Sequence, residues 1–318
     1  MCRRTVVALM LAVTSGCGGA AVAPDDAPAD ATTDGGEIDA PTCGWSESRD
    51  VAVVPDPRLT EISGMVASHR DPGILFVHND SGETVARYFA IDTSGAVRAE
   101  IVIDGAPAFD VEDCALEVDG EREWMWLGDV GDNAARDGGA PRAFVEVARA
   151  EVPPLPTSAA EAVHVAEHEL FRFTYPDAPH DCEAIAFDPP TGDLYLLSKE
   201  NDGPHVVYRA AAPHVDGTTR VLERVGEILT GRSLADAITA VDADARGRFV
   251  VRTYRSIFLF DGPVTSPGER WAAPPVALPT VREFQGEALA FAHDARTLYS
   301  IAEGEAETLH ALDDGCAP

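Results

Sequence analysis

Short apolar runs separated by turn residues fill the chain from Cys43 onward, and the pattern recurs about every fifty residues. Each repeat starts with an acidic residue followed by small and apolar residues, at Glu61, Glu112, Glu183, Asp236 and Glu287. A second, almost continuous apolar run follows 11 to 13 residues later, at 74–77, 124–127, 194–197, 249–252 and 298–301. Uninterrupted apolar runs of this length between turns predict strands that are buried on both faces.

The third repeat predicts the complete structural unit. Its strands are expected to start at Glu183 and to continue at 194–198, 205–209 and 221–228. Four short antiparallel strands in about fifty residues form one blade of a β-propeller. We therefore predict an all-β fold for residues 45–318, a propeller of about five four-stranded blades. The spacing of 71 residues between the second and third starts leaves a sixth blade open as an alternative.

The last repeat ends before a fourth strand can form. Residues 50–54, just before the first repeat, read Asp-Val-Ala-Val-Val and are suited to supply that strand. Pairing of the N-terminal and C-terminal strands closes the ring and removes an exposed edge. We expect the propeller to be closed in this way.

The first 17 residues have the three parts of an export signal. Two arginines precede a short apolar run at 6–13, and small residues lead to Cys17. The run is too short to span a bilayer, which takes about 20 apolar residues. Residues 13–17 resemble the bacterial lipobox, except that Thr14 stands where Leu is usual, and this predicts a lipidated Cys17. A secretory signal cut near Ala23 is the alternative.

Composition adds a tether and a strong negative charge. Residues 18–44 contain almost no large apolar side chain, and we expect a disordered acidic tether there. The chain has 54 acidic and 24 basic residues and a formal net charge of −30. This excess disfavours nucleic acid and concentrates cations. We expect a monomeric lipoprotein of the cell envelope, on the outer membrane or cell surface, that contacts the membrane through its lipid and binds an unidentified small molecule or protein.

Four cysteines remain once the signal is removed and the lipidated residue is set aside. An even number of cysteines in an exported chain favours disulfides, and four allow three pairings. We predict Cys43–Cys316, which would fasten the chain ends, and Cys114–Cys182, which would join neighbouring blades. The spacing of Cys and His does not match a zinc motif.

In a propeller, the loops before the inner strand and after the second strand open on the same face. The five acidic starts, here called the acidic ring, are therefore expected beside the polar segments that follow each second strand. The residues expected to bind a ligand there are Asn79, Asp80, Asp129, Asp132, Asn133, Asp181, Arg255 and Glu303.

The acidic ring predicts a metal site, a joint between blades, or both. Five carboxylates crowded at one opening repel one another until some take up protons or a cation neutralises them. A hard ion with oxygen ligands, such as Ca²⁺, suits this composition. In the alternative, each carboxylate accepts backbone N–H bonds from the adjacent blade and locks the ring.

Catalytic candidates on the same face are His78, His180, Lys199 and Arg252. The two histidines are possible general bases, and the two cations are suited to hold phosphate or carboxylate. Each also has a structural alternative: a turn hydrogen bond for a histidine, an ion pair with the acidic ring for a cation. The sequence contains no G-x-S-x-G motif, no metalloprotease helix motif and no phosphate-binding glycine loop.

As a set, several segments resemble a group of bacterial exported β-propellers, WD40-like or phytase-like, to which no reaction is assigned. These segments are 61–64 with 78–82, 112–113 with 128–133, 180–184 with 194–199, 250–254, and 285–288. The resemblance covers about residues 58 to 312 and implies the propeller fold. More remotely, the chain is similar to phytase-like propellers, whose calcium ions and basic residues hydrolyse phosphoesters.

Two functional hypotheses follow. The first is a surface-tethered, non-enzymatic propeller that binds Ca²⁺, and with it a small ligand or partner, at its acidic face. The second is a calcium-dependent hydrolase of phosphate esters, in which the metal polarises the substrate or activates water while Lys199 and Arg252 hold the anion. The sequence does not choose between them and names no substrate.

Overall fold

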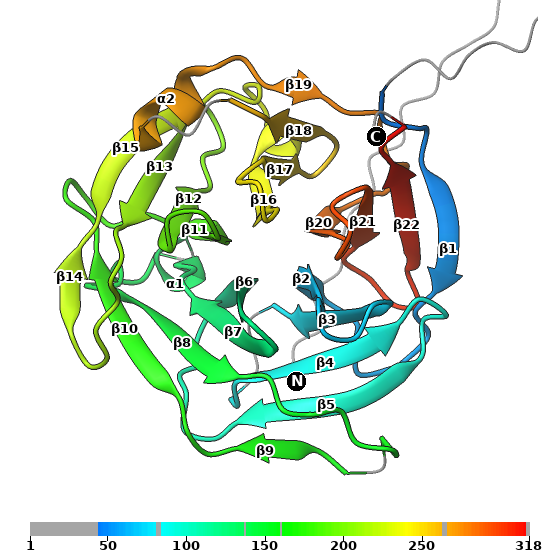
Figure 1. Cartoon of the computed structure of the whole chain (residues 1–318). Helices are drawn as coiled ribbons and strands as arrows, with labels where there is room; N and C mark the ends of the chain where they lie inside the picture. The colour runs from blue at the N-terminus through cyan, green and yellow to red at the C-terminus, as the bar shows by residue number, and fades with distance from the viewer. Residues whose placement is uncertain (1–43, 81–83, 137, 160, 263–265, 316–318) are drawn as a thin grey trace, which may run out of the picture. The chain divides into compact units, whose positions relative to one another are not determined.

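Five β-sheets stand around a common centre, and each sheet is one propeller blade (Figure 1). The structure is a computed structural model that describes residues 44–80, 84–136, 138–159, 161–262 and 266–315. In every blade the first strand lies nearest the centre and the following strands lead outward. The predicted all-β propeller of five blades is confirmed.

The blades follow one another in sequence order, with four main strands each. Blade 1 consists of β2 (Ile62–Ala67), β3 (Ile74–Asn79), β4 (Arg87–Asp92) and β5 (Val97–Ile103). Blade 2 consists of β6 (Val111–Asp119), β7 (Arg122–Asp129), β8 (Val145–Glu151) and β10 (Glu169–Thr174). Blade 3 consists of β11 (Cys182–Asp188), β12 (Asp193–Ser198), β13 (His205–Ala210) and β15 (Glu223–Ile228). Blade 4 consists of β16 (Ile238–Ala243), β17 (Phe249–Thr253), β18 (Ile257–Phe260) and β19 (Val276–Ala277).

Blade 5 joins the two ends of the described chain. It consists of β20 (Gly286–Phe291), β21 (Thr297–Ala302), β22 (Thr308–Asp313) and the N-terminal β1 (Arg49–Val53). Strand β1 pairs antiparallel with β22 (Figure 1). Beyond this pair, the Gly315 N–H donates to the Gly44 carbonyl at 3.0 Å. The predicted closure of the ring is confirmed, and it covers the edge of β22.

The long spacing before blade 3 holds a crossing strand rather than a sixth blade. Strand β9 (Val163–Val165) adds in parallel to β5, the outer strand of blade 1. In the same way β14 (Thr219–Val221), from the third repeat, adds in parallel to β10 of blade 2. These additions tie neighbouring blades together at their outer edges.

Each neighbouring pair of blades encloses one apolar core, and the five cores account for the apolar second strands. A second strand lies between two neighbouring blades, so both of its faces are buried. Between blades 2 and 3, Trp126 stacks on Phe171 and Phe187, with ring centroids 5.1 and 5.7 Å away. Truncating such a side chain to Ala costs about 3 to 5 kcal/mol of folding free energy.

Helices are short and lie in the connections between strands. They are α1 (Asn133–Arg136), a 3-10 turn at Leu234–Asp236, and α2 (Pro267–Ala272). The Trp271 side chain of α2 is buried in the core between blades 3 and 4. Within the described ranges, we find no helix whose length and apolar character would let it cross a membrane.

The predicted Cys114–Cys182 disulfide is wrong, because both residues are free, buried thiols. Cys114 lies in the core between blades 1 and 2, and Cys182 lies in the core between blades 2 and 3. Blade 2 therefore separates the two side chains. The other predicted pair, Cys43–Cys316, lies outside the described residues, as do the signal, Cys17 and the tether up to residue 43.

Candidate functional site

Every inner strand has one β-bulge at the same place, near its start. The register with the second strand shifts once per blade, and the inserted residues are Ser63, Glu112, Glu183, Thr239 and Glu287. A bulge leaves its extra residue outside the ladder and turns its side chain in a new direction. Three carboxyl groups and two hydroxyl groups thus occupy equivalent positions around one end of the ring.

This register places the acidic ring differently in blades 1 and 4. Glu112, Glu183 and Glu287 are equivalent residues, whereas Glu61 and Asp236 lie two and three residues before the equivalent positions. The hydroxyl groups there join neighbouring blades: Ser63 donates to the Glu112 carbonyl at 2.5 Å, and Thr239 donates to the Gly286 carbonyl at 2.9 Å. In blades 1 and 4, hydroxyl groups therefore make the joint that the sequence suggested for carboxylates.

Four of the five bulge residues, all except Thr239, line a polar cavity of about 170 Å³, here called the acidic cavity. Six carboxyl groups line it, from all blades except the fourth: Glu61, Asp80, Glu112, Glu183, Glu287 and Glu303. The remaining lining residues are Ile62, Ser63, Asn133, Lys199 and Tyr254. Among these described residues, Lys199 is the one cation, so negative charge is in large excess.

Glu112 belongs to two groups of carboxyl oxygens that are close enough to share an ion. One group is Asp80, Asp110 and Glu112, and the other is Glu112, Asp181 and Glu183; within each, the oxygens lie within 4.8 Å of one another. Oxygens bound to the same Ca²⁺, at 2.3 to 2.6 Å, are at most about 5 Å apart. Both groups therefore fit a hard divalent cation.

The segment after β7 holds the first group in place. The Asn133 backbone N–H donates to Asp110 at 2.7 Å, and its side-chain amide donates to Asp110 at 2.9 Å and Glu112 at 3.1 Å. A Cβ atom on Gly131 would lie 2.2 Å from the nearer Glu112 oxygen and 2.8 Å from the Asp110 carboxyl. Glycine is therefore required at position 131 for this segment to approach the two carboxyl groups so closely.

Lys199 forms a buried ion pair within the acidic cavity. Its ammonium lies 2.8 Å from a Glu183 oxygen and 5.1 Å from the centre of the Tyr254 ring. Burial disfavours the charged lysine, but Glu183, Tyr254 and Glu287 together outweigh burial and raise the pKa of Lys199 above its ordinary value. Lys199 is therefore a permanent positive charge among the carboxyl groups.

The carboxyl groups that face Lys199 are hard to ionise. Burial, followed by repulsion from Glu183, raises the pKa of Glu112 well above its usual value. Burial raises the pKa of Glu287 as well, although Lys199 opposes the shift. One Glu287 oxygen, Oε2, is buried and has no hydrogen-bond partner among the described residues. A cation or a hydrogen-bond donor from a ligand would stabilise this arrangement.

Two of the predicted catalytic residues lie in ion pairs away from this cavity. Arg252 is 1% exposed and pairs with Glu283 and Ser300, so it does not stand beside Lys199 as expected. His180 lies 3.3 Å from both Asp177 and Glu200, and the hydrogen bond with Glu200 raises its pKa.

A third candidate, His78, is 1% exposed, and burial lowers its pKa to about 4. It does not line the acidic cavity. Only Lys199 of the four candidates does so.

The other predicted ligand-binding residues divide in the same way. Asp80, Asn133 and Glu303 line the cavity, and Asp181 belongs to the second carboxyl group. Four residues instead make structural bonds: Asn79 donates to the Arg58 carbonyl, Asp129 pairs with Arg142, Asp132 accepts from the Arg142 N–H, and Arg255 pairs with Asp236. Asp236 is thereby occupied and does not line the cavity.

Two further residues belong to the candidate site and were not predicted from the sequence, Asp110 and Tyr254. Asp110 precedes Glu112 by two residues, a spacing that should have suggested a second carboxyl group in the same place. Tyr254 follows the second strand of blade 4, where the expected candidates were the two neighbouring arginines. Its ring contacts Lys199, and burial raises its pKa.

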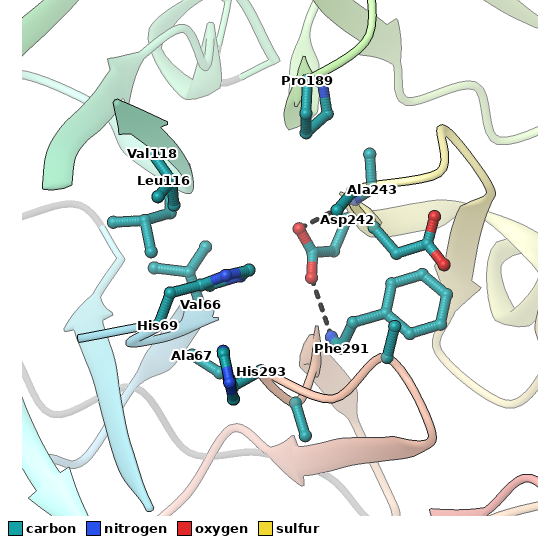
Figure 2. A pocket seen from close by; sticks show the side chains of 14 residues that line it. Val66, Ala67, His69, Leu116, Val118, Pro189, Asp242, Ala243, Phe291 and His293 are labelled. Atoms are coloured by element: carbon teal, nitrogen blue, oxygen red, sulfur yellow. Dashed lines mark hydrogen bonds between the residues drawn. The ribbon is translucent and has the colours of Figure 1, made fainter. Parts of the chain in front are cut away.

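A second cavity, of about 250 Å³, lies at the opposite ends of the inner strands. Figure 2 shows the Asp242 carboxylate there, bonded to the backbone N–H groups of Ala243 and Phe291, with His69 and His293 across the cavity. Burial raises the pKa of Asp242 to about 7, although these hydrogen bonds oppose the shift. Apart from Asp244, the remaining wall consists of apolar side chains such as Leu116 and Val118, so this cavity differs chemically from the acidic cavity.

No protein-family model matches this sequence, and no curated protein matches it. Solved structures are similar in fold, and three of them are enzymes described as follows. A gluconolactonase of Xanthomonas campestris is 16% identical with a TM-score of 0.46, over 82% of this chain and 88% of that one. A luciferin-regenerating enzyme is 11% identical with a TM-score of 0.41, over 82% and 94%. The soluble aldose sugar dehydrogenase of Escherichia coli, in the apo-form, is 10% identical with a TM-score of 0.45, over 85% and 99%. Similarities of this size transfer no activity and no site residue to this chain.

Proposed function

We propose that the acidic cavity binds a divalent cation, Ca²⁺, and that the loaded site hydrolyses uncharged carboxyl esters. The observation that carries this proposal is the position of Glu112, which belongs to two groups of carboxyl oxygens beside an open cavity. All of the grouped ligand atoms are oxygens, which suits Ca²⁺ better than softer metals.

Specific residues of the chain are suited to hold the ion and to act beside it. Asp80, Asp110 and Glu112, or Glu112, Asp181 and Glu183, would bind the cation. A bound Ca²⁺ supplies positive charge that polarises an ester carbonyl.

Glu287 is outside both groups, and its unpartnered Oε2 is the base that takes a proton from the attacking water. Burial raises the pKa of Glu287, so its carboxylate, once ionised beside the bound cation, is a stronger base than an ordinary glutamate. Lys199, held by Glu183, supplies a fixed positive charge for the oxygen that becomes negative.

The charge of the cavity argues against an anionic substrate. Six carboxyl groups and one ammonium line it, and that ammonium is already paired with Glu183. Arg252, which would hold a phosphate beside Lys199, is instead buried against Glu283. An uncharged ester avoids the repulsion that a phosphate ester would meet, so the phosphoesterase form of the hydrolase hypothesis has little support.

A non-enzymatic cation-binding propeller is the second candidate. The observation in its favour is that the cavity's cation and amide already have partners: Lys199 pairs with Glu183, and Asn133 bonds Asp110 and Glu112. A site whose donors are occupied in this way suits an ion that stays in place and stabilises the ring.

Calorimetric titration of the full chain with Ca²⁺, combined with an ester screen, tests both candidates. We expect saturable calcium binding, and hydrolysis of neutral nitrophenyl esters that chelator abolishes, with no hydrolysis of nitrophenyl phosphate. Glu287→Gln should retain calcium and lose about a hundredfold or more in kcat. Calcium binding without hydrolysis of any ester would support the non-enzymatic cation-binding propeller. Absence of calcium binding would exclude both that propeller and the calcium-dependent esterase.

We also propose that the propeller is tethered at the cell envelope through a lipid on Cys17, as the sequence of the N-terminal segment suggests. In a bacterial host that processes lipoproteins, the chain should partition into the detergent phase of a Triton X-114 extract. Cys17→Ser should move it to the aqueous phase; an unchanged distribution would favour the ordinary secretory signal.

A further inference from the structure

A histidine, an aspartate and a cysteine meet between blades 1 and 2, close to the acidic cavity but outside its lining. His78 comes from β3, and Asp113 and Cys114 come from β6. One ligand atom of each lies within 4.8 Å of the other two, and each residue is 1% exposed. The carboxyl groups of the acidic cavity offer oxygen alone, whereas these three side chains offer nitrogen and sulfur in addition to oxygen.

The hydrogen bond of His78 defines which of its ring atoms is available. Nδ1 lies 2.9 Å from the Asn79 carbonyl oxygen, which can only accept, so Nδ1 carries the proton. Nε2 of the neutral ring then carries a lone pair, and it is buried without any hydrogen-bond partner in the described part of the chain. This is the state of a metal-binding histidine, whose other nitrogen usually donates to a carbonyl or carboxylate.

Gly64 leaves the space that this imidazole occupies. A Cβ atom at position 64 would lie 2.1 Å from His78 Nε2 and 2.9 Å from the Cys114 backbone nitrogen. The His78 atom belongs to a buried ring that has little room to move, and the Cys114 atom belongs to the backbone. A glycine in β2 therefore lets His78 reach the start of β6, across the boundary between blades.

The other two groups are also prepared for a ligand. Cys114 is a free thiol. The Asp113 carboxyl is fixed by backbone N–H bonds from Cys114 at 2.8 Å and Ile185 at 2.9 Å. Hydrogen bonds of this kind orient ligating carboxylates in metal proteins.

We propose that His78, Asp113 and Cys114 form a buried zinc site that joins blade 1 to blade 2. Nitrogen, thiolate and carboxylate ligands suit Zn²⁺, whereas a hard ion such as Ca²⁺ prefers oxygen alone. On binding, Cys114 gives up its thiol proton to solvent and bonds as the thiolate, while His78 bonds through its Nε2 lone pair. The ion connects β3 to β6 and stabilises the folded ring, and this role depends on neither the calcium site nor the esterase activity.

Cobalt replacement tests the site by a signal that only a metal–thiolate bond produces. The full chain, refolded with Co²⁺ and Ca²⁺ present, should show a thiolate-to-cobalt charge-transfer band in the near ultraviolet. The protein refolded with Zn²⁺ should contain about one tightly held zinc per chain by elemental analysis. Cys114→Ser and His78→Ala should each lose the band and most of the zinc.

Cys182→Ser is the matched control, because Cys182 is also a free, fully buried thiol but belongs to no group of metal-ligating side chains among the described residues. It should keep both the band and the zinc, as should Glu112→Gln, which removes a calcium ligand. A wild-type cobalt form without the band would overturn the proposal, whatever the folding of the variants. A band lost equally in Cys182→Ser would overturn it too.

Discussion

Glu112 and Glu183 occupy the same bulge position in neighbouring blades, and their carboxyl oxygens lie within 4.8 Å of each other. Both side chains are buried, and the Glu183 charge contributes to the raised pKa of Glu112. Because a bulge fixes each side chain, the backbone holds the two carboxyl groups together despite their repulsion. A divalent cation between them would convert this unfavourable contact into a stabilising one.

Calcium should therefore raise the melting temperature of the wild-type chain relative to chelator. A ligand that binds only the folded state stabilises it by about 2.7 kcal/mol when its concentration is a hundred times its dissociation constant. Glu112→Gln should abolish this gain, because Glu112 belongs to both carboxyl groups, and Glu183→Gln should reduce it. Differential scanning fluorimetry with Ca²⁺ and with EGTA measures the difference.

Glu123→Gln provides the control for that experiment. Glu123 is equally buried but binds Ser68 and the backbone of His69 and Arg70, at the opposite end of the β6–β7 pair from Glu112. The variant should melt earlier with and without calcium and should keep the full calcium-dependent gain. Identical melting of the wild type in both buffers would contradict the calcium site.

The blades could be predicted because their strongest signal is local. The second strand of each blade, such as Leu194–Leu197 within β12, is packed on both faces and so reads as an apolar run. Ring closure followed from a strand missing at one end and a spare strand at the other. Both inferences depend on patterns within a few consecutive residues.

The site was harder to predict because it depends on bulges and on partners distant in sequence. Ser63 and Thr239 are equivalent to Glu112, but an acidic neighbour in each repeat concealed the equivalence. Arg252 follows the pattern of an exposed strand end, yet Glu283, 31 residues later, holds it in the interior. The glycine at 286 leaves room for it, since a Cβ atom there would overlap the guanidinium.

Asp242, in the second cavity, should make stability depend on pH between about 4 and 8. Its folded-state pKa of about 7 is raised above the ordinary value of 3.8, so the folded protein holds a proton that the unfolded chain releases. Stability from this group is present at low pH and is lost as the pH rises through 7. The difference in unfolding free energy between wild type and Asp242→Asn should fall by about 2 to 3 kcal/mol from pH 4.5 to pH 8.

Urea denaturation at several pH values measures this difference. His69 and His293 line the same cavity, and Asp244 lies close enough to contribute to the shift, so Asp242→Asn is compared with wild type at each pH rather than across pH values. Parallel stability curves for the two proteins would show that Asp242 does not control the dependence.

The cysteines next to the closed ends of the ring should be joined as Cys43–Cys316. Their neighbours Gly44 and Gly315 are hydrogen-bonded at 3.0 Å, and Trp45 pairs with Asp314. A non-reducing peptide map should recover the linked pair, and Cys43→Ser should lower the unfolding free energy by about 2 to 5 kcal/mol under oxidising conditions only. Recovery of Cys43 linked to Cys114 or Cys182 would contradict both this pairing and the free thiols.

Removal of the Lys199 charge should destabilise the folded protein and increase its affinity for calcium. Lys199→Met leaves the Glu183 carboxylate buried without the ammonium that pairs with it. Removing one partner of a buried ion pair lowers the free energy of unfolding by about 3 to 5 kcal/mol in the absence of metal. The same change removes a positive charge that repels the cation, so calcium affinity should rise at least about tenfold.

Arg248→Met is the matched control, since Arg248 pairs with buried Asp244 at 2.8 Å and lies in neither group of carboxyl oxygens proposed to bind calcium. That variant should lose stability without any change in calcium affinity. If Lys199→Met binds calcium no more tightly than wild type, the ion does not lie beside Glu183, and the group of Asp80, Asp110 and Glu112 is left as its site.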